Sequence, residues 1–422
     1  MSERRIIQSI VWQGRVCDCV LEEDRISELR PAEEEGSGGE LILLPGLIDC
    51  HTHLREPGQE HKEDIASGLA AAASGGFSSI LCMANTDPVN DTAAITSMML
   101  DTAARAHPRG PALHPVGALS RGLAGKELAP MHELARSGCI AFSNDGVPVS
   151  DSSLMRRAME YSFDLQRPII DHCEDPSLSP EGVVSEGPLS DRLGLRGVPS
   201  VCESIQVARD ILLASYLDIP VHLAHISRRE SVELIHWAKN KGVPVSAETC
   251  PHYLLWTEDK VGDYDPLAKV NPPLGTADDV TALRQAAREG IIDILATDHA
   301  PHAPFEKEVP LSRAPNGISG LDTALSLSWG LVQEGVLTQK DLIRLWCHGP
   351  ARIFGLRANG FNPGDPADFL LFDPRESWTP TADSMRSRGK NTPCLNQELP
   401  GRIRLNCREG EVLYGQFPKG IA

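Results

Sequence analysis

A pair of histidines separated by one residue is the first feature of the sequence that could do chemistry: His51 and His53, in the segment Asp-Cys-His-Thr-His. Alternate residues of a β-strand point to the same side, so both imidazoles could bind one metal ion. Such a pair alone is weak support for a metal site, because a single buried histidine is more often a hydrogen-bonded core residue. The pair predicts a metal site only if further ligands come from elsewhere in the chain.

Four more side chains of metal-binding type follow short apolar runs elsewhere in the chain: Asp145, His172, His225 and Asp298. With the histidine pair they offer four nitrogen and two carboxylate donors, a set that suits one or two Zn²⁺ ions and that Mn²⁺ or Co²⁺ could also use. A bound zinc ion can lower the pKa of a water molecule toward ~7 and can polarise a carbonyl group. The six residues together predict a metal centre that activates water.

Each of these residues stands at the end of a predicted β-strand. Eight short apolar runs recur along the chain, at 46–53, 79–85, 114–120, 139–145, 168–172, 220–225, 244–248 and 292–298. Helical spacing is found between them at 64–74, 152–164, 200–215, 231–240 and 277–289. Eight such units predict a closed (β/α)₈ barrel in preference to an open doubly wound sheet, and no GxGxxG follows the first strand. The carboxyl ends of barrel strands converge on one face, which would bring the six residues together.

The two ends of the chain have a different character. Short β-like segments punctuated by Gly, Pro and Asn occur at 6–12, 15–22, 367–372, 401–407 and 411–414. They predict a small β-sandwich domain built from both termini, residues 1–45 and 357–422, beside a catalytic barrel at 46–356. The stretch 303–319 follows the last barrel strand, shows little periodicity and is expected to form a mobile loop over the active site.

Charge and cysteine usage exclude several classes of function. The chain has 58 acidic and 40 basic side chains and a net charge of −18, which disfavours binding to nucleic acids and to anionic membrane surfaces. No apolar run approaches the ~18 residues that a membrane helix needs. The 11 cysteines are scattered without a CxxC pair, which favours a reducing, cytoplasmic location.

Eight ordered segments of the chain resemble the amidohydrolase superfamily and, within it, the dihydroorotases of the bacterial long-chain (class I) type. The resemblance covers most of the chain. The segments are 49–58 (DCHTHLREPG), 75–88, 142–146 (FSNDG), 171–174 (DHCE), 224–227 (AHIS), 248–253 (ETCPHY), 270–274 (VNPPL) and 297–302 (TDHAPH).

The resemblance implies roles for individual residues. The implied metal ligands are His51, His53, His172 and His225, with Asp145 bridging two ions and Asp298 both binding metal and moving the proton as the catalytic base and acid. The implied substrate-binding residues are Arg55, Asn85 and His302 for a carboxylate and Asn271 for the ring. The implied reaction is the zinc-dependent, reversible hydrolysis of (S)-dihydroorotate to N-carbamoyl-L-aspartate, the third step of de novo pyrimidine biosynthesis.

Two other functions stay open at this point. Hydantoinases and allantoinases bridge their metals with a carboxylated lysine on strand four, but no lysine occurs between Lys126 and Lys239, and Asp145 is the obvious substitute. A non-catalytic scaffold for aspartate carbamoyltransferase would be expected to lose metal ligands, yet all six are present. An active enzyme could bind that partner as well, and neither this association nor a homodimer is decided by the sequence.

Overall fold

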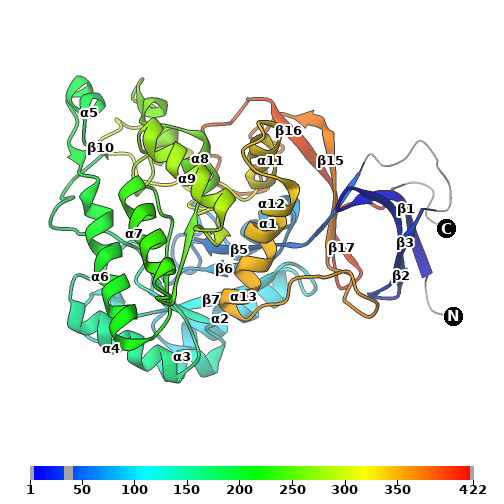
Figure 1. Ribbon diagram of the computed structural model, residues 1–422, viewed down its shortest axis with the longest axis horizontal. Coiled ribbons are helices and arrows are strands. Elements are labelled where there is room, and N and C mark those ends of the chain that lie inside the picture. The colour runs from blue at the N-terminus through cyan, green and yellow to red at the C-terminus, as the bar shows by residue number, and fades with distance from the viewer. Residues whose placement is uncertain (1–3, 33–40, 419–422) are drawn as a thin grey trace.

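Eight parallel strands form the central sheet of the computed structural model, which describes residues 4–32 and 41–418 of the 422-residue chain (Figure 1). The strands lie in chain order, from the first to the last. They are β5 (Leu47–Thr52), β6 (Phe77–Cys82), β7 (Ala112–Ala118), β8 (Ala141–Ser143), β9 (Ile169–Asp171), β12 (Val221–Leu223), β13 (Val245–Thr249) and β14 (Ile294–Leu295). Each corresponds to one of the eight predicted strands, and the predicted barrel is confirmed.

The barrel closes where the chain after β14 meets β5. Thr52 forms a parallel bridge with His299, and the backbone N–H of His53 donates to the carbonyl of His299 at 2.8 Å. The buried carboxylate of Asp49 accepts the backbone N–H of Thr297 at 3.0 Å and that of His51 at 3.1 Å. This closure holds the two ends of the sheet, and the polar residues on them, in one fixed arrangement.

Helices cover the outside of the barrel. They are α1 (Ile65–Ser74), α2 (Ala93–Ala106), α3 (Met131–Ser137), α4 (Ser152–Asp164), α5 (Pro188–Leu193), α6 (Val201–Leu217), α7 (Arg229–Asn240), α8 (Pro251–Leu255), α9 (Ala277–Glu289), α10 (Pro304–Lys307), α11 (Ala324–Gln333), α12 (Gln339–Ile343) and α13 (Gly349–Phe354). Shorter elements are the 3₁₀ turns η1 (Arg121–Leu123), η2 (Glu258–Val261) and η3 (Pro266–Ala268), the π-helical turn η4 (Arg344–His348), and the strand pair β10 (Val184–Ser185) and β11 (Gly197–Val198). The five predicted helices correspond to α1, α4, α6, α7 and α9.

Local sequence explains where these helices begin. The side chain of Asp64 caps α1 by accepting the backbone N–H of Ser67. The side chain of Thr276 caps α9 by accepting the backbone N–H of Asp279. The predicted loop 303–319 contains one short helix, α10, which begins at Pro304, a residue type favoured in the first turn. The loop was not predicted to contain a helix, and its mobility stays a prediction.

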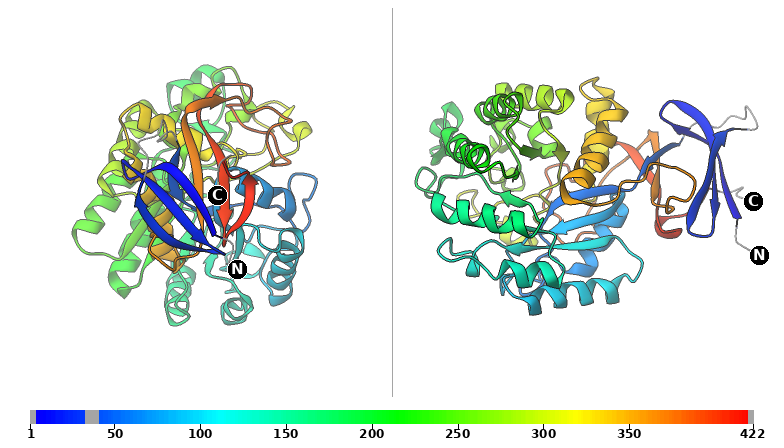
Figure 2. Two further views of the ribbon diagram at one scale, coloured as in Figure 1. Left: turned by 90° about the vertical axis from the view of Figure 1, so that its right-hand side faces the viewer. Right: turned by 60° about the horizontal axis from the view of Figure 1, so that its bottom comes forward.

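A second sheet of seven strands stands beside the barrel and combines both ends of the chain (Figure 2). Its order is β17-β16-β15-β4-β1-β2-β3, antiparallel except for β1 and β4. The strands are β1 (Arg4–Trp12), β2 (Arg15–Glu22), β3 (Arg25–Pro31), β4 (Ile42–Pro45), β15 (Phe369–Trp378), β16 (Leu399–Arg408) and β17 (Glu411–Gly415).

The predicted small β-domain from both termini is thus present, and its two layers belong to one continuous sheet. Side chains from the N-terminal strands, such as Ile7 and Ile26, share a core with Phe369 and Leu405 from the C-terminal strands. The predicted domain limits 1–45 and 357–422 stay a prediction, and their segments 1–3, 33–40 and 419–422 lie outside the described residues.

Two layers of apolar packing fix the barrel strands. One core lies between the sheet and the outer helices, and the other fills the barrel interior with Ile48, Leu81, Ile170 and Ile294. Because this interior plug is apolar, polar groups in the barrel gather above it, at the carboxyl ends of the strands.

All eleven cysteines are buried and none is in a disulfide. Among the helices of residues 4–32 and 41–418, none combines the length and the apolar character needed to cross a membrane.

The closure of the barrel yields a first prediction. Asp49→Ala leaves the backbone N–H groups of His51 and Thr297 buried without their acceptor, so we expect the free energy of unfolding to fall by about 3 kcal/mol. Metal retention should fall with it, because the strand end that carries His51 loses its anchor. Chemical denaturation and metal analysis measure the two effects. Asp18→Ala, which removes a buried aspartate from the small sheet, should lower stability without changing metal retention; equal metal loss in both variants would contradict this account.

Candidate metal centre

The structure brings the six predicted metal ligands together at the carboxyl end of the barrel. All six are buried, and five different strands position them. His51 lies on β5 with His53 just beyond it, while the other four directly follow or closely follow their strands: Asp145 after β8, His172 after β9, His225 after β12 and Asp298 after β14.

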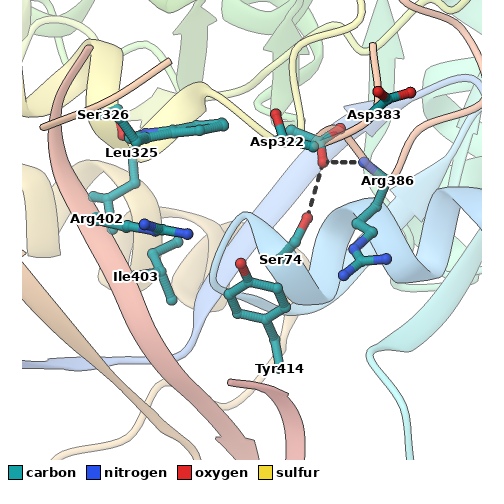
Figure 3. A pocket seen from close by; sticks show the side chains of 11 residues that line it. Ser74, Asp322, Leu325, Ser326, Asp383, Arg386, Arg402, Ile403 and Tyr414 are labelled. Atoms are coloured by element: carbon teal, nitrogen blue, oxygen red, sulfur yellow. Dashed lines mark hydrogen bonds between the residues drawn. The ribbon is translucent and has the colours of Figure 1, made fainter. Parts of the chain in front are cut away.

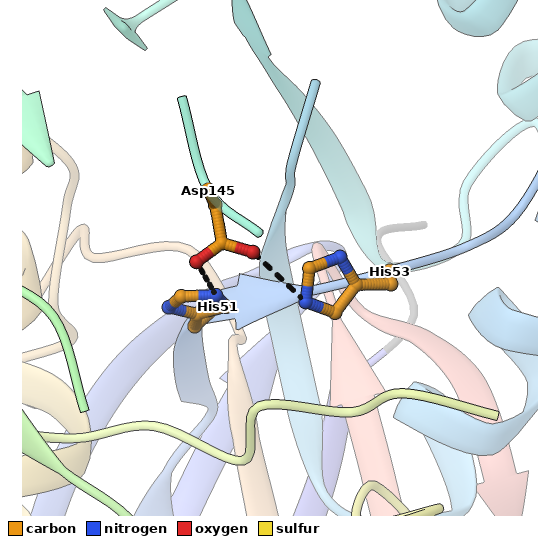
Figure 4. A group of neighbouring side chains, drawn as sticks. All are labelled: His51, His53 and Asp145. Carbon is orange, nitrogen blue, oxygen red and sulfur yellow. Dashed lines mark ion pairs between the residues drawn. The ribbon is translucent and has the colours of Figure 1, made fainter. Parts of the chain in front are cut away.

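Asp145 lies at the centre of this group, and Figure 4 shows it between His51 and His53. Its Oδ1 atom is 3.2 Å from His51 Nε2, 3.2 Å from His172 Nδ1 and 3.3 Å from His225 Nε2. Its Oδ2 atom is 3.4 Å from His53 Nε2. The aspartate therefore joins two potential three-ligand metal sites, one with His51 and His53 and the other with His172 and His225.

Asp298 lies at the edge of the first of these two sites. Its Oδ1 atom is 3.1 Å from His53 Nε2 and 3.7 Å from His51 Nε2. The backbone of Asp298 has a positive φ of 46°, and that of His225 has a φ of 31°. Non-glycine residues seldom adopt this region, and its use at two strand ends in one site indicates that the surrounding structure holds these side chains in place.

Neighbouring side chains orient three of the four imidazoles. His51 Nδ1 lies 2.7 Å from Glu248 Oε1 and His53 Nδ1 lies 2.8 Å from the side-chain oxygen of Asn85. Since an oxygen of this kind accepts, each Nδ1–H donates outward and each Nε2 lone pair faces the Asp145 side. An outward hydrogen bond of this type orients histidine ligands in metal sites.

In His172 the two ring nitrogens have exchanged roles compared with His51 and His53. Its Nε2–H donates to Glu174 Oε2 at 2.9 Å, so its Nδ1 faces Asp145. For His225 it is Nε2 that faces Asp145, and within the described part of the chain its Nδ1 has no hydrogen-bond partner.

These orientations test whether a metal ion fits. Nitrogen lone pairs and carboxylate oxygens face one another, which is repulsive unless protons or a cation lie between them. His51 Nε2 is fully buried and makes no hydrogen bond to the described residues, although Asp145 is close. An orphaned imidazole nitrogen among carboxylates is the donor chemistry of a divalent metal site, so the residues fit the predicted metal.

The titration behaviour of the site shows the same need for positive charge. Burial opposes charge on His51, but the carboxylates of Asp145 and Glu248 raise the pKa of this imidazole well above its usual value. Burial also opposes charge on His172, but Asp145 and Glu174 raise its pKa to about 10. Burial favours the neutral form of Asp145, yet the surrounding histidines hold the pKa of this carboxyl well below its usual range. A divalent cation can replace the protons that these groups otherwise hold.

The four predicted substrate-binding residues lie around this centre. Arg55 Nε donates to the carbonyl of Pro301 at 3.3 Å, and Asp298 and Asp145 are among the charges that act on it. Arg55 is partly buried, and the burial of its guanidinium lowers the pKa of this group. His302 Nε2–H donates to the carbonyl of Asn316 at 2.9 Å.

The two predicted asparagines contact the residues that orient the histidines. Asn85 binds His53, as described above, and Asn271 Nδ2 donates to Glu174 Oε2 at 2.8 Å. The structure thus places both asparagines next to the predicted ligands. Their roles toward a substrate remain predictions.

Two glutamates of the site were not predicted as functional residues. Glu248 ends the seventh predicted strand, on which Val245 and Ala247 pack outward, so alternation directs Glu248 into the barrel. Glu174 follows His172 by two residues. The pKa of the Glu174 carboxyl, which burial would raise, is lowered to about 2 by His172. The strand pattern could have drawn attention to Glu248, whereas Glu174 lies in the segment 171–174 that carries the family resemblance but has no periodic pattern that would assign it a role.

Comparison with known proteins places the chain in a family. A family model described as "Dihydro-orotase-like" matches residues 39–231. The chain is 46% identical to the dihydroorotase of Geobacter metallireducens over 417 residues, which are 97% of this chain and 98% of that protein. It is 45% identical to the dihydroorotase of Syntrophotalea carbinolica over 404 residues, 94% of each chain. The chain belongs to the dihydroorotase family.

Solved structures with the same fold are more distant than these dihydroorotases. The L-hydantoinase (dihydropyrimidinase) of Arthrobacter aurescens is 22% identical, with a TM-score of 0.83 over 98% of this chain and 97% of that one. The dihydropyrimidinase of Brevibacillus agri is 20% identical, with a TM-score of 0.79 over 98% and 96%. At this identity the likeness concerns the fold alone. The predicted family and its enzyme class, the cyclic amide hydrolases, are confirmed by the dihydroorotase relatives.

The hydrogen bonds of Glu248 generate a prediction about metal affinity. Glu248 accepts from His51 through Oε1 and from His222 through Oε2, at 2.7 and 3.1 Å. Glu248→Gln keeps the shape but offers only one carbonyl acceptor, so we expect zinc affinity to fall about 10- to 100-fold. Competition with a chromophoric chelator measures the change. Glu203→Gln, at a buried glutamate that binds Ser227 instead of a histidine, is the control and should keep wild-type affinity; an unchanged affinity in Glu248→Gln would refute the orienting role.

His302 generates a prediction about pH dependence. Burial and the nearby charge of Arg55 lower the pKa of His302 to about 2, so the imidazole stays neutral over the pH range of an assay. A folded-state pKa below the usual value means that protonation sets in only in strong acid. We expect His302→Asn to raise KM while leaving the acid limb of the pH–kcat/KM profile at its wild-type position. A shift or loss of that limb would show that His302 titrates during turnover.

Proposed function

We propose that the protein catalyses the reversible hydrolysis of (S)-dihydroorotate to N-carbamoyl-L-aspartate, the third step of de novo pyrimidine synthesis. The observation that carries the proposal is the pair of three-ligand sites joined by Asp145, in a chain of the dihydroorotase family. Hydantoinase or allantoinase activity is disfavoured because an aspartate, and no lysine, lies between the two histidine pairs.

We propose zinc as the metal, one or two ions per chain. His51, His53 and Asp145 would hold one ion and His172, His225 and Asp145 the other, with Asp298 as a further ligand. When bound, the metal supplies Lewis acidity that activates water and polarises the amide carbonyl.

Asp298 is the group proposed to move the proton. Its carboxylate is buried, which opposes its charge, yet the neighbouring histidines, first of all His53 at 3.1 Å, lower its pKa. In the ionised form it can accept the proton of the attacking water. As the bond between the carbonyl carbon and the ring nitrogen breaks, the same carboxyl returns that proton to the leaving nitrogen. In the reverse direction it takes the proton from the carbamoyl nitrogen as the ring closes.

Arg55 is the group proposed to hold the substrate carboxylate. A guanidinium can bind a carboxylate through two parallel hydrogen bonds, and its burial strengthens that attraction. His302, Asn85 and Asn271 complete the proposed binding site as neutral hydrogen-bonding groups. A neutral hydantoin offers no carboxylate for Arg55, which gives the site a basis for selecting dihydroorotate.

We also propose a cytoplasmic location, supported by eleven free, buried thiols. We further propose two associations for testing, a homodimer and a complex with aspartate carbamoyltransferase. Light scattering of the purified protein alone, and after mixing with that enzyme, tests both.

Asp298→Ala tests the proposed chemistry directly. We expect kcat for L-dihydroorotate hydrolysis to fall by about 10³-fold or more, because the group that moves the proton is lost. Ultraviolet absorbance of dihydroorotate follows turnover, with hydantoin and allantoin assayed beside it and metal content determined on the same sample. Asp164→Ala, at an exposed aspartate of α4, should keep wild-type kcat. Near-normal turnover by Asp298→Ala would remove Asp298 from the mechanism, and a wild-type protein that hydrolysed only hydantoin or allantoin would refute the proposed substrate.

A further inference from the structure

The segment between β15 and β16 leaves the small sheet and contacts the mouth of the barrel. Residues 385–391 of this segment, called the brace below, lie against the loop that follows β14, which carries Asp298 and His302. Asn391 of the brace is 72 to 91 residues from its partners in that loop, so these contacts are made only in the folded chain.

One end of the brace is fixed by Asp322. This buried carboxylate accepts the backbone N–H of Arg386 at 2.7 Å and that of Ser387 at 3.2 Å. It also accepts the hydroxyl of Ser74 from α1 at 2.9 Å, as Figure 3 shows. The brace therefore begins at a fixed point on the outside of the barrel.

Glu63 fixes the next residues of the brace, closer to the metal centre. Its buried carboxylate accepts the backbone N–H of Arg388 at 2.9 Å and the hydroxyl of Ser387. The same carboxylate accepts from His299 Nε2 at 3.3 Å, and His299 directly follows Asp298. A single glutamate thus joins the brace to the neighbour of the proposed proton carrier.

Asn391 makes the closest connection between the brace and the loop. Its side-chain oxygen accepts the backbone N–H of His302 at 2.8 Å and the hydroxyl of Ser319 at 2.8 Å. Its amide nitrogen donates to the carbonyls of Ala300 at 3.0 Å and Gly317 at 2.9 Å. The side chain, 3% exposed, uses its full hydrogen-bonding capacity on the two ends of one loop.

The brace also packs closely against this loop. A Cβ atom at Gly389 would lie 2.5 Å from the Cβ of Pro301 and 2.9 Å from the backbone nitrogen of His302. The backbone of the brace can approach the loop only because residue 389 is a glycine. Pro301 in turn offers its carbonyl to Arg55, so this contact reaches the proposed carboxylate site.

We propose that Asn391 is a positioning residue of the active site, through which the C-terminal part of the chain fixes the loop that carries His302. The proposal rests on the function proposed above for its catalytic consequence. Asn391 does not contact the substrate; it sets the position of His302, of Pro301 and thereby of Arg55. The small sheet, by supplying the brace, contributes to substrate binding as well as to folding.

The test compares Asn391→Asp with the same substitution at a second buried asparagine, Asn359→Asp. Asn391→Asp keeps the two acceptor positions but loses both donated bonds and places a carboxylate against the carbonyls of Ala300 and Gly317. We expect kcat/KM for dihydroorotate to fall about 10²-fold, mostly through KM, because a displaced binding group costs orientation. Metal content should stay at the wild-type level. Ser319→Ala, which removes one hydroxyl donor to Asn391, should give a smaller change in the same direction and serves if Asn391→Asp does not fold.

Asn359→Asp is the matched control. Asn359 is 5% exposed and likewise donates to two carbonyls, of Pro366 and Asp368, while accepting one backbone N–H, but all of these partners lie within ten residues of it and away from the barrel mouth. We expect it to lower thermal stability and leave KM unchanged. An equal loss of kcat/KM in both variants would reduce the role of Asn391 to general stability and overturn the proposal.

Hydrogen exchange separates this proposal from the proposed function. Peptides covering 300–317 should lose protection in Asn391→Asp and keep it in Asn359→Asp, whatever substrate the enzyme uses. A wild-type protein inactive on dihydroorotate would refute the proposed function, and this exchange experiment would still decide the role of the brace. Unchanged exchange together with unchanged KM in Asn391→Asp would overturn the positioning role.

Discussion

The placement of one carboxylate among four imidazoles is the constraint on which the rest of this structure depends. Asp145 lies within 3.4 Å of a nitrogen of each of four histidines from three different strand ends. Such a cluster is costly to bury without compensating positive charge, and a divalent metal supplies that charge. An aspartate between the two histidine pairs also separates this centre chemically from lysine-bridged relatives.

Much of the surrounding structure orients these imidazoles and the carboxylate of Asp145. The barrel brings the carboxyl ends of the strands together above an interior that is largely apolar. Glu248, Glu174 and Asn85 then select which nitrogen of three of the histidines faces Asp145. Outside this layer, Asp49 closes the barrel, and Asn391 holds the loop that follows its last strand. The precision of the centre therefore comes from hydrogen bonds that span much of the chain.

The sequence predicted the parts of this arrangement that follow from local pattern. Recurring short apolar runs and helix spacing led to the eight barrel strands, and His172 and Asp298 could be placed at strand ends without any structure. The small domain was predicted from its β-like segments, but the single continuous sheet was not, because the pairing of β4 with β15 joins residues over 300 positions apart. Helix α10 was missed because one turn of helix has no periodicity to detect.

The site residues that the sequence did not predict were missed for the same physical reason. Glu248 acts on a histidine 197 residues away, and Asn391 acts on a loop up to 91 residues away. No local pattern marks a side chain whose partners are set by tertiary packing. The predicted metal ligands are of distinctive residue types and could be picked out, whereas the residues that orient them are ordinary glutamates and asparagines.

Anomalous diffraction at the zinc absorption edge, from crystals of the zinc-loaded protein, tests the central claim most directly. The account predicts one or two zinc peaks, each about 2.0–2.2 Å from an oxygen of Asp145 and from histidine nitrogens of one of the two pairs. Zinc bound elsewhere, or bound to histidines with Asp145 turned away, would contradict the account.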